Sequence, residues 1–123
     1  MSLARPRVLI ADDHPEVTKA VCRLLSLDCE IVGTVADGSA LLEAVQRLDP
    51  DVVVLDVNLT GVHGLEACRQ LTQLNPAIKI VAFSAMNEPE LIEALIAAGA
   101  SAFVSKMASA DLLATISRLC ADR

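Results

Sequence analysis

Residues 51–56 read Asp-Val-Val-Val-Leu-Asp, four aliphatic residues with a carboxylate at each end. The aliphatic part is continuous rather than alternating, which is typical of a strand covered on both faces. Four more short, largely apolar runs occur at residues 8–11, 31–35, 80–83 and 102–104. We interpret the five runs as five buried strands.

Aliphatic side chains recur at helical spacing in the segments that follow these runs. The recurring positions are Val17/Val21/Leu24/Leu25, Leu41/Val45/Leu48, Ala67/Leu71/Leu74, Leu91/Leu95 and Leu112/Ile116/Leu119. Strands that alternate with helices favour right-handed crossovers and a parallel sheet. The sequence therefore predicts a three-layer α/β fold.

Turn and capping residues separate the predicted elements. Those that favour helix starts are Pro15, Asp37 or Ser39, and Ser109. Those that favour helix ends are Asp49 before Pro50, Asn75 before Pro76, and Gly99. We expect the helices to begin and end at these positions.

Composition and charge exclude several classes of protein. A chain of 123 residues is long enough for one domain and too short for two. With two Phe and no Trp or Tyr, the core must be aliphatic. The net charge of -6 argues against nucleic-acid binding by this chain alone. No apolar run approaches the roughly 18 residues of a membrane span, and we expect a cytoplasmic protein.

The four cysteines are Cys22, Cys29, Cys68 and Cys120. They form no Cys-x-x-Cys pair and have no histidine at zinc-site spacing. We interpret them as reduced thiols with a packing role, as in a cytoplasmic protein.

Polar residues follow four of the five predicted strands. The first strand leads into residues 12–14, Asp-Asp-His, and the third ends at Asp56. The fourth is followed by Ser84 and the fifth by Lys106. Ligands of open parallel sheets bind outside the carboxyl ends of the strands, so we expect these side chains to form one site.

The residue types of this site favour phosphoryl chemistry with a metal ion. Asp12, Asp13 and Asp56 repel one another unless a cation enters, and oxygen ligands suit Mg²⁺. Lys106 adds a mobile cation and Ser84 a hydroxyl donor. A carboxylate beside a metal ion, an ammonium and a hydroxyl can attack phosphorus, and these neighbours can hold the phosphorylated product.

The two histidines give no comparable signal. His14 is interpretable as a base or ligand, but its place beside a helix cap favours a surface or loop residue, and His63 is similar. The chain has neither a P-loop motif nor a Gly-x-Gly-x-x-Gly after the first strand. These absences argue against a P-loop nucleotidase and a dinucleotide-binding protein.

The stretches at residues 8–15, 51–59, 81–85 and 99–106 together resemble the receiver domains of bacterial two-component response regulators. The resemblance covers residues 1–123 as one receiver domain. It implies a flavodoxin-like (βα)5 fold with a five-stranded parallel sheet of order 2-1-3-4-5. It also implies a phosphorylation-dependent signalling switch rather than an enzyme, with self-catalysed phosphoryl acceptance and slow autodephosphorylation.

The resemblance assigns Asp56 as the phosphoacceptor. It implies that Asp13, Asp56 and the main-chain carbonyl of Asn58 bind Mg²⁺ or Mn²⁺ directly, and that Asp12 acts mainly through water. Asn58 and Met86 would flank the phosphoryl group and set its lifetime by controlling water access.

The resemblance also implies a switch. Ser84 would turn toward the phosphoryl oxygen, Lys106 would pair with it, and Phe103 would change rotamer when the Ser84 loop moves. A role of Phe103 as a strand core residue is equally compatible with the sequence. The chain departs from the family at Thr60, where proline is usual, and a less rigid loop there would alter metal geometry or dephosphorylation.

The implied partner is a sensor histidine kinase, and the predicted helix 4–strand 5–helix 5 face would then change its partner affinity. A homodimer on phosphorylation is a further expectation. The resemblance is to the branch joined to a helix-turn-helix DNA-binding half, and we expect that output domain to be absent from this chain. Two alternatives are a phosphatase, which usually needs an acid where Asn58 stands, and a docking domain that is not phosphorylated.

Overall fold

The computed structural model describes residues 5–121. Its strands are β1 (Arg7–Ala11), β2 (Glu30–Val35), β3 (Val52–Asp56), β4 (Lys79–Ser84) and β5 (Ala102–Ser105). Its α-helices are α1 (Pro15–Leu25), α2 (Gly38–Leu48), α3 (Gly64–Leu74), α4 (Pro89–Ala97) and α5 (Asp111–Leu119). Both ends of the predicted domain, residues 1–123, lie outside the described residues.

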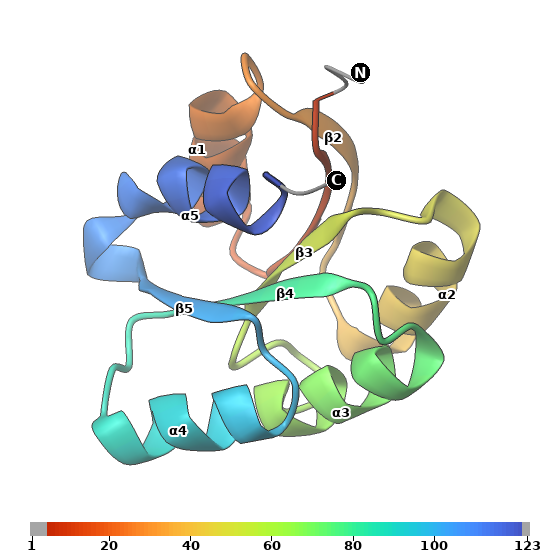
Figure 1. Ribbon diagram of the computed structural model, residues 1–123, viewed down its shortest axis with the longest axis vertical. Helices are drawn as coiled ribbons and strands as arrows, with labels where there is room; N and C mark the ends of the chain where they lie inside the picture. Colours follow the sequence, from red (N-terminus) through yellow and green to blue (C-terminus); the bar gives the residue numbers. More distant parts are fainter. Residues whose placement is uncertain (1–4, 122–123) are drawn as a thin grey trace.

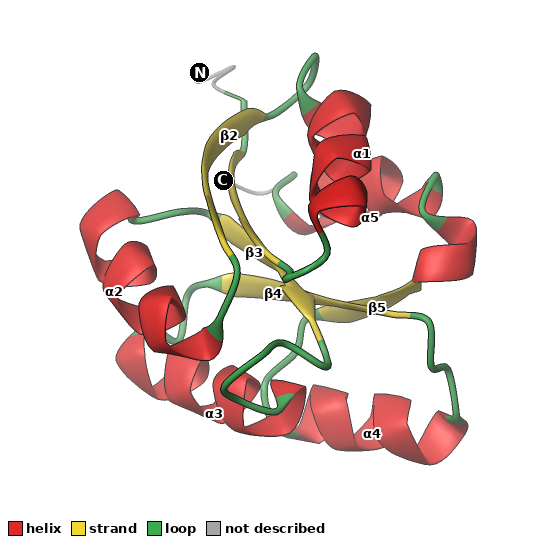
Figure 2. Cartoon of the chain, turned by 180° about the vertical axis from the view of Figure 1, so that it is seen from behind, coloured by secondary structure: helices red, strands yellow, loops and turns green. Residues whose placement is uncertain are grey.

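The strands form one parallel sheet in the order β2-β1-β3-β4-β5 (Figure 1). Helices α1 and α5 cover one face, and α2, α3 and α4 cover the other, as both views show (Figures 1 and 2). The predicted fold class, the parallel sheet and the strand order are confirmed.

Burial differs between the centre and the edge of the sheet. Every residue of β3 is buried, because the strand lies between β1 and β4 and has helices on both faces. The prediction of a fully buried strand is wrong for β2, whose residues are half-buried or exposed, although Ile31 packs on the core of one face and Val32 and Val35 on that of the other. The physical reason is that β2 is an edge strand, with a neighbour on one side only.

Several predicted helix boundaries are confirmed. Pro15 begins α1, and the Asp37 side chain caps α2 by accepting a hydrogen bond from the Ala40 amide at 3.0 Å. Asp49 ends α2 in a left-handed conformation, with φ of 49°. Gly99 follows α4 with φ of 122°, a backbone conformation that residues other than glycine rarely adopt.

The predicted cap of the last helix is wrong. A short 3-10 helix, η1 (Lys106–Ala108), lies between β5 and α5 and moves the start of α5 to Asp111. Ala110 therefore occupies the capping position, without a side-chain hydrogen bond, and Ser109 ends η1 instead.

The cysteines pack as predicted. Within residues 5–121 they form no disulfide. Cys29 and Cys68 are buried on opposite faces of the sheet, and burial raises the pKa of the Cys68 thiol to about 11. Such a thiol is protonated at neutral pH and unreactive. No helix in the described part of the chain is long and apolar enough to cross a membrane.

Candidate functional site

The strand register places the predicted site residues at one edge of the sheet. Ala11 at the end of β1 pairs with Leu55, so Asp12 and Asp56 follow side by side. Ser84 at the end of β4 pairs with Ser105, the residue before Lys106. The expectation that these side chains gather at the carboxyl ends of the strands is therefore met by the fold.

The centre of this edge is a group of acids with one histidine. Asp12, Asp13, His14 and Asp56 each offer one ligand atom, and these atoms lie within 4.8 Å of one another. Asp12 and Asp56 are only 5% and 3% exposed. One buried oxygen of each of the three carboxylates accepts no hydrogen bond: Asp12 Oδ2, Asp13 Oδ1 and Asp56 Oδ2. We call Asp12, Asp13 and Asp56 the acidic group.

The two oxygens of Asp56 have different surroundings. Oδ1 accepts a hydrogen bond from the Asn58 amide at 3.1 Å, whereas Oδ2 accepts none. Burial raises the pKa of this carboxyl, and the nearby Asp12 adds to the effect, against the Asn58 hydrogen bond and Lys106. Ionised Asp56 is thus disfavoured until more positive charge reaches it.

Lys106 supplies part of that charge. Its Nζ lies 3.0 Å from Asp12 Oδ2 and 3.6 Å from Asp56 Oδ2. The same ammonium lies 5.6 Å from the centre of the Phe83 ring, within the range of a cation–π contact. Lys106 therefore bridges two carboxylates of the acidic group, but one ammonium cannot balance three negative charges.

His14 takes part in the site more than the sequence suggested. Its side chain is 59% exposed, as expected of a surface residue, yet Nδ1 lies 2.8 Å from Asp12 Oδ1 and 3.1 Å from Asp13 Oδ1. The hydrogen bond to Asp12 raises the pKa of the imidazole. The only signal for this contact was its position directly after Asp12-Asp13.

Thr60 is a second residue whose contact the sequence did not reveal. Its hydroxyl donates to Asp13 Oδ2, and this hydrogen bond is the main cause that lowers the pKa of Asp13. The sequence marked Thr60 only as a departure from a family pattern. Because 47 residues separate the two partners, no local pattern could have paired them.

Close contacts link several of the residues that the resemblance placed around Asp56. Ser84 is buried, and its Oγ accepts a hydrogen bond from the Met86 amide at 3.0 Å. The Asn58 side-chain amide lies 3.6 Å from Met86 Sδ. Phe103 is half-buried and packs on the core under α2, α3 and α4. This packing fits its reading as a core residue, and the switch role stays a prediction.

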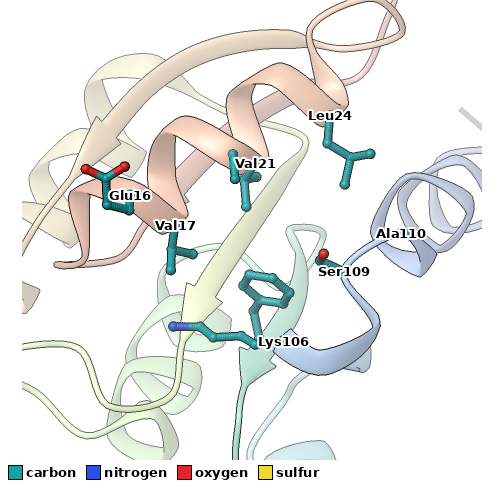
Figure 3. Close-up of a pocket in the computed structure, with 9 residues that line it drawn as sticks. Glu16, Val17, Val21, Leu24, Lys106, Ser109 and Ala110 are labelled. Atoms are coloured by element: carbon teal, nitrogen blue, oxygen red, sulfur yellow. The ribbon is translucent and has the colours of Figure 1, made fainter.

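A mostly apolar pocket of about 430 Å³ borders the site between α1 and the segment that leads into α5 (Figure 3). Val17 and Val21 line it from α1, and the buried Phe83 and the alkyl stem of Lys106 line it from the sheet side. Lys106 is thus shared between this pocket and the acidic group.

The acidic group fits a divalent cation such as Mg²⁺. Its three buried carboxylate oxygens accept no hydrogen bond. Lys106 and His14 approach them, but the single Lys106 ammonium does not balance three carboxylates, which repel one another. Carboxylate oxygen is also the ligand that Mg²⁺ prefers. The main-chain carbonyl of Asn58 as a further ligand stays a prediction.

Comparison with known proteins agrees with this geometry. Residues 8–118 match the family model of the response regulator receiver domain. Response regulator GacA of Pseudomonas viridiflava is 38% identical over 102 residues, which are 81% of this chain and 48% of the relative. Nitrate/nitrite response regulator protein NarL of Escherichia coli is 33% identical over 117 residues, 93% of this chain and 54% of the relative.

Solved structures are similar over almost the whole chain. A two-component response regulator of the LuxR family from an Aurantimonas species has a TM-score of 0.91 and 30% identity, covering 98% of this chain and 88% of that one. The chain spans about half the length of the curated relatives it matches. Because the family model matches residues 8–118, the chain belongs to the response regulator receiver domain family.

Proposed function

We propose that this chain is a phosphorylation-dependent signalling switch in which Asp56 accepts a phosphoryl group from a sensor histidine kinase. The observation that carries the proposal is the state of Asp56. Its carboxylate is buried at the end of the central strand, with one oxygen hydrogen-bonded and the other not. Family membership and the neighbouring Lys106 support it.

The two oxygens of Asp56 would have different roles in the transfer. The Asn58 amide holds Oδ1 and so fixes the rotation of the carboxylate. Oδ2 is then free to attack, and its bond to phosphorus forms as the bond from phosphorus to the donor nitrogen breaks. The leaving imidazole takes the bonding electron pair. A positioned nucleophile of this kind gains rate mainly from orientation.

Positive charge and hydrogen-bond donors would then hold the product. Lys106 Nζ, already 3.6 Å from Asp56 Oδ2, would pair with a phosphoryl oxygen. The buried Ser84 hydroxyl keeps its proton to donate, because its oxygen accepts from the Met86 amide. Asp13, Asp56 and the Asn58 carbonyl would hold Mg²⁺, with Asp12 acting through water. The bound ion would offset the charge that develops on the phosphoryl oxygens.

The response would be read out on the α4–β5–α5 face. Leu95 is the only buried residue of α4, and Ile96 on the same helix is 46% exposed. Met107, just after β5, is also largely exposed. Exposed apolar side chains of this kind suit a partner surface, so we propose that phosphorylation changes binding here, including binding to a second copy of this chain.

The whole protein would control transcription. The relatives are about twice as long as this chain, which leaves room for a DNA-binding output domain. We propose that the receiver domain regulates such a domain, in the cytoplasm where a kinase can reach it.

Phosphoryl acceptance can be tested with acetyl phosphate and intact-mass measurement. Wild type should gain one phosphoryl group with Mg²⁺ or Mn²⁺ and none in chelator. Asp56→Asn should gain none under either condition. Asp28→Asn, which removes an exposed carboxylate, is the matched control and should behave as wild type. Equal incorporation in Asp56→Asn and wild type would contradict the assignment of Asp56.

The roles of Lys106 and Ser84 can be separated from acceptance itself. Lys106→Ala and Ser84→Ala should still become phosphorylated, although more slowly. They should show smaller phosphorylation-induced NMR shifts at Phe103 and along α4 than wild type, because the phosphoryl group would lose a contact that distinguishes the two states. Shifts identical to those of phosphorylated wild type would contradict this coupling.

A further inference from the structure

Asp13 differs from the other two carboxylates of the acidic group in its exposure. Its side chain is 26% exposed, whereas those of Asp12 and Asp56 are at most 3% exposed. Packing therefore constrains its carboxylate less than those of Asp12 and Asp56. Its two oxygens have different surroundings: Oδ2 accepts from the Thr60 hydroxyl, and Oδ1 is buried without a hydrogen bond, 3.1 Å from His14 Nδ1.

Thr60 is held in place by contacts that do not involve the acidic group. Its carbonyl accepts a hydrogen bond from the Gly38 amide at 2.7 Å, and it pairs with Asp37 in an isolated parallel bridge. A Cβ on Gly38 would collide with a methyl of Val62. The loop after Asp56 therefore packs closely on the start of α2, which fixes the backbone that carries the hydroxyl.

We propose that Thr60 is a positioning residue for the cation site. Its hydroxyl holds Asp13 Oδ2 and so directs Oδ1 toward the ion. The inference rests on the proposed function, because it assumes that the acidic group binds Mg²⁺. Partners that orient metal ligands contribute strongly to metal affinity. A proline at position 60 has no hydroxyl and could not make this contact.

The same hydrogen bond has an opposite consequence that the experiment must separate. A hydroxyl that donates to Oδ2 also makes the Asp13 carboxylate a weaker electron donor, and it makes Oδ2 less available as a ligand of the ion. If that competition dominated, loss of the hydroxyl would strengthen Mg²⁺ binding. The positioning role requires the reverse, because Oδ1 is the buried oxygen of Asp13 that is left without a hydrogen bond.

Calorimetric titration of Mg²⁺ into the full chain tests whether loss of the Thr60 hydroxyl weakens or strengthens Mg²⁺ binding. Thr60→Val, which keeps the shape and loses the hydroxyl, should weaken Mg²⁺ binding by about tenfold or more. Thr60→Ala should weaken it similarly and serves if the valine variant fails to fold. Thr60→Ser keeps a donor and should stay close to wild type. Thr115→Val is the matched control, because that hydroxyl donates to the Asp111 carbonyl within α5.

A double-mutant cycle ties the effect to Asp13. In an Asp13→Asn background, Thr60→Val should change Mg²⁺ affinity much less than in wild type. Unchanged or tighter binding by both Thr60→Val and Thr60→Ala would overturn the positioning role while leaving the proposed function intact. Absence of Mg²⁺ binding by wild type would overturn the metal dependence of the proposed function, and the positioning role with it.

Discussion

Replacing Asp56 by Asn should raise the melting temperature of the metal-free protein. The change keeps the shape and the oxygen that accepts from the Asn58 amide, but it removes a buried negative charge. Burial is the largest cause of the raised pKa of Asp56, so ionisation opposes folding. Residues that serve function at the expense of stability commonly behave in this way.

The size of the gain follows from three contributions. Oxygens of Asp12 and Asp56 lie within 4.8 Å of each other, and at a dielectric constant of about 20 they repel by roughly 3.5 kcal/mol. Lys106 Nζ, 3.6 Å from Asp56 Oδ2, attracts by roughly 4.6 kcal/mol. Together they favour the charged form by about 1 kcal/mol, which offsets part of the desolvation cost of a buried carboxylate, several kcal/mol per ion. We expect a net gain on the order of 1–2 kcal/mol, or roughly 4–8 °C.

Thermal melts followed by circular dichroism, in chelator and with Mg²⁺, measure this gain. Wild type should be stabilised by Mg²⁺, by about 2.7 kcal/mol at a hundred times the dissociation constant. Asp56→Asn should gain much less from Mg²⁺, because it lacks one carboxylate. Asp28→Asn controls for the change in net charge and should match wild type in both conditions. An Asp56→Asn variant that melts at or below wild type in chelator, with an undiminished Mg²⁺ response, would refute a shared acidic site.

Two further predictions concern a titrating group and a backbone position. The pKa of His14 is raised above 6.5, so its stabilisation of the metal-free fold is present below pH 6.5 and lost as the pH rises through the folded pKa. As the pH rises through that range, the melting temperature should fall less in His14→Gln than in wild type. An equal fall in the two proteins would contradict a stabilising role of the His14 charge. Gly99→Ala should cost about 1–3 kcal/mol, because φ is 122° and the new Cβ would meet Thr72 Oγ1. Urea unfolding checks this, and Thr72→Ala should restore only the steric part.

The strand pattern predicted much of the site because it is a local property. Continuous aliphatic runs mark buried strands, and parallel strands end at one edge of the sheet. Asp12, Asp56, Ser84 and Lys106 can therefore be grouped from the order of residues alone, and the register confirms that grouping. The resemblance to a family added the strand order and the proposed roles.

The start of α5 and the burial of β2 were not predicted, because neither depends on local sequence pattern alone. Ser109 is a good capping residue, but η1 uses that segment and α5 begins later. The run at residues 31–35 looks buried, but β2 is at the edge of the sheet. In both cases the neighbours in space, rather than the residue types, determine the outcome.

The sequence by itself determined the α/β architecture, the aliphatic core and the edge at which the polar residues meet. These follow from periodicity and from where each strand ends. Only the tertiary structure decided which oxygen of each carboxylate is hydrogen-bonded, that the His14 ring contacts Asp12, and that Thr60 holds Asp13. Such contacts join loops far apart in the chain, and their geometry depends on loop conformation and side-chain rotamers, which packing in three dimensions sets.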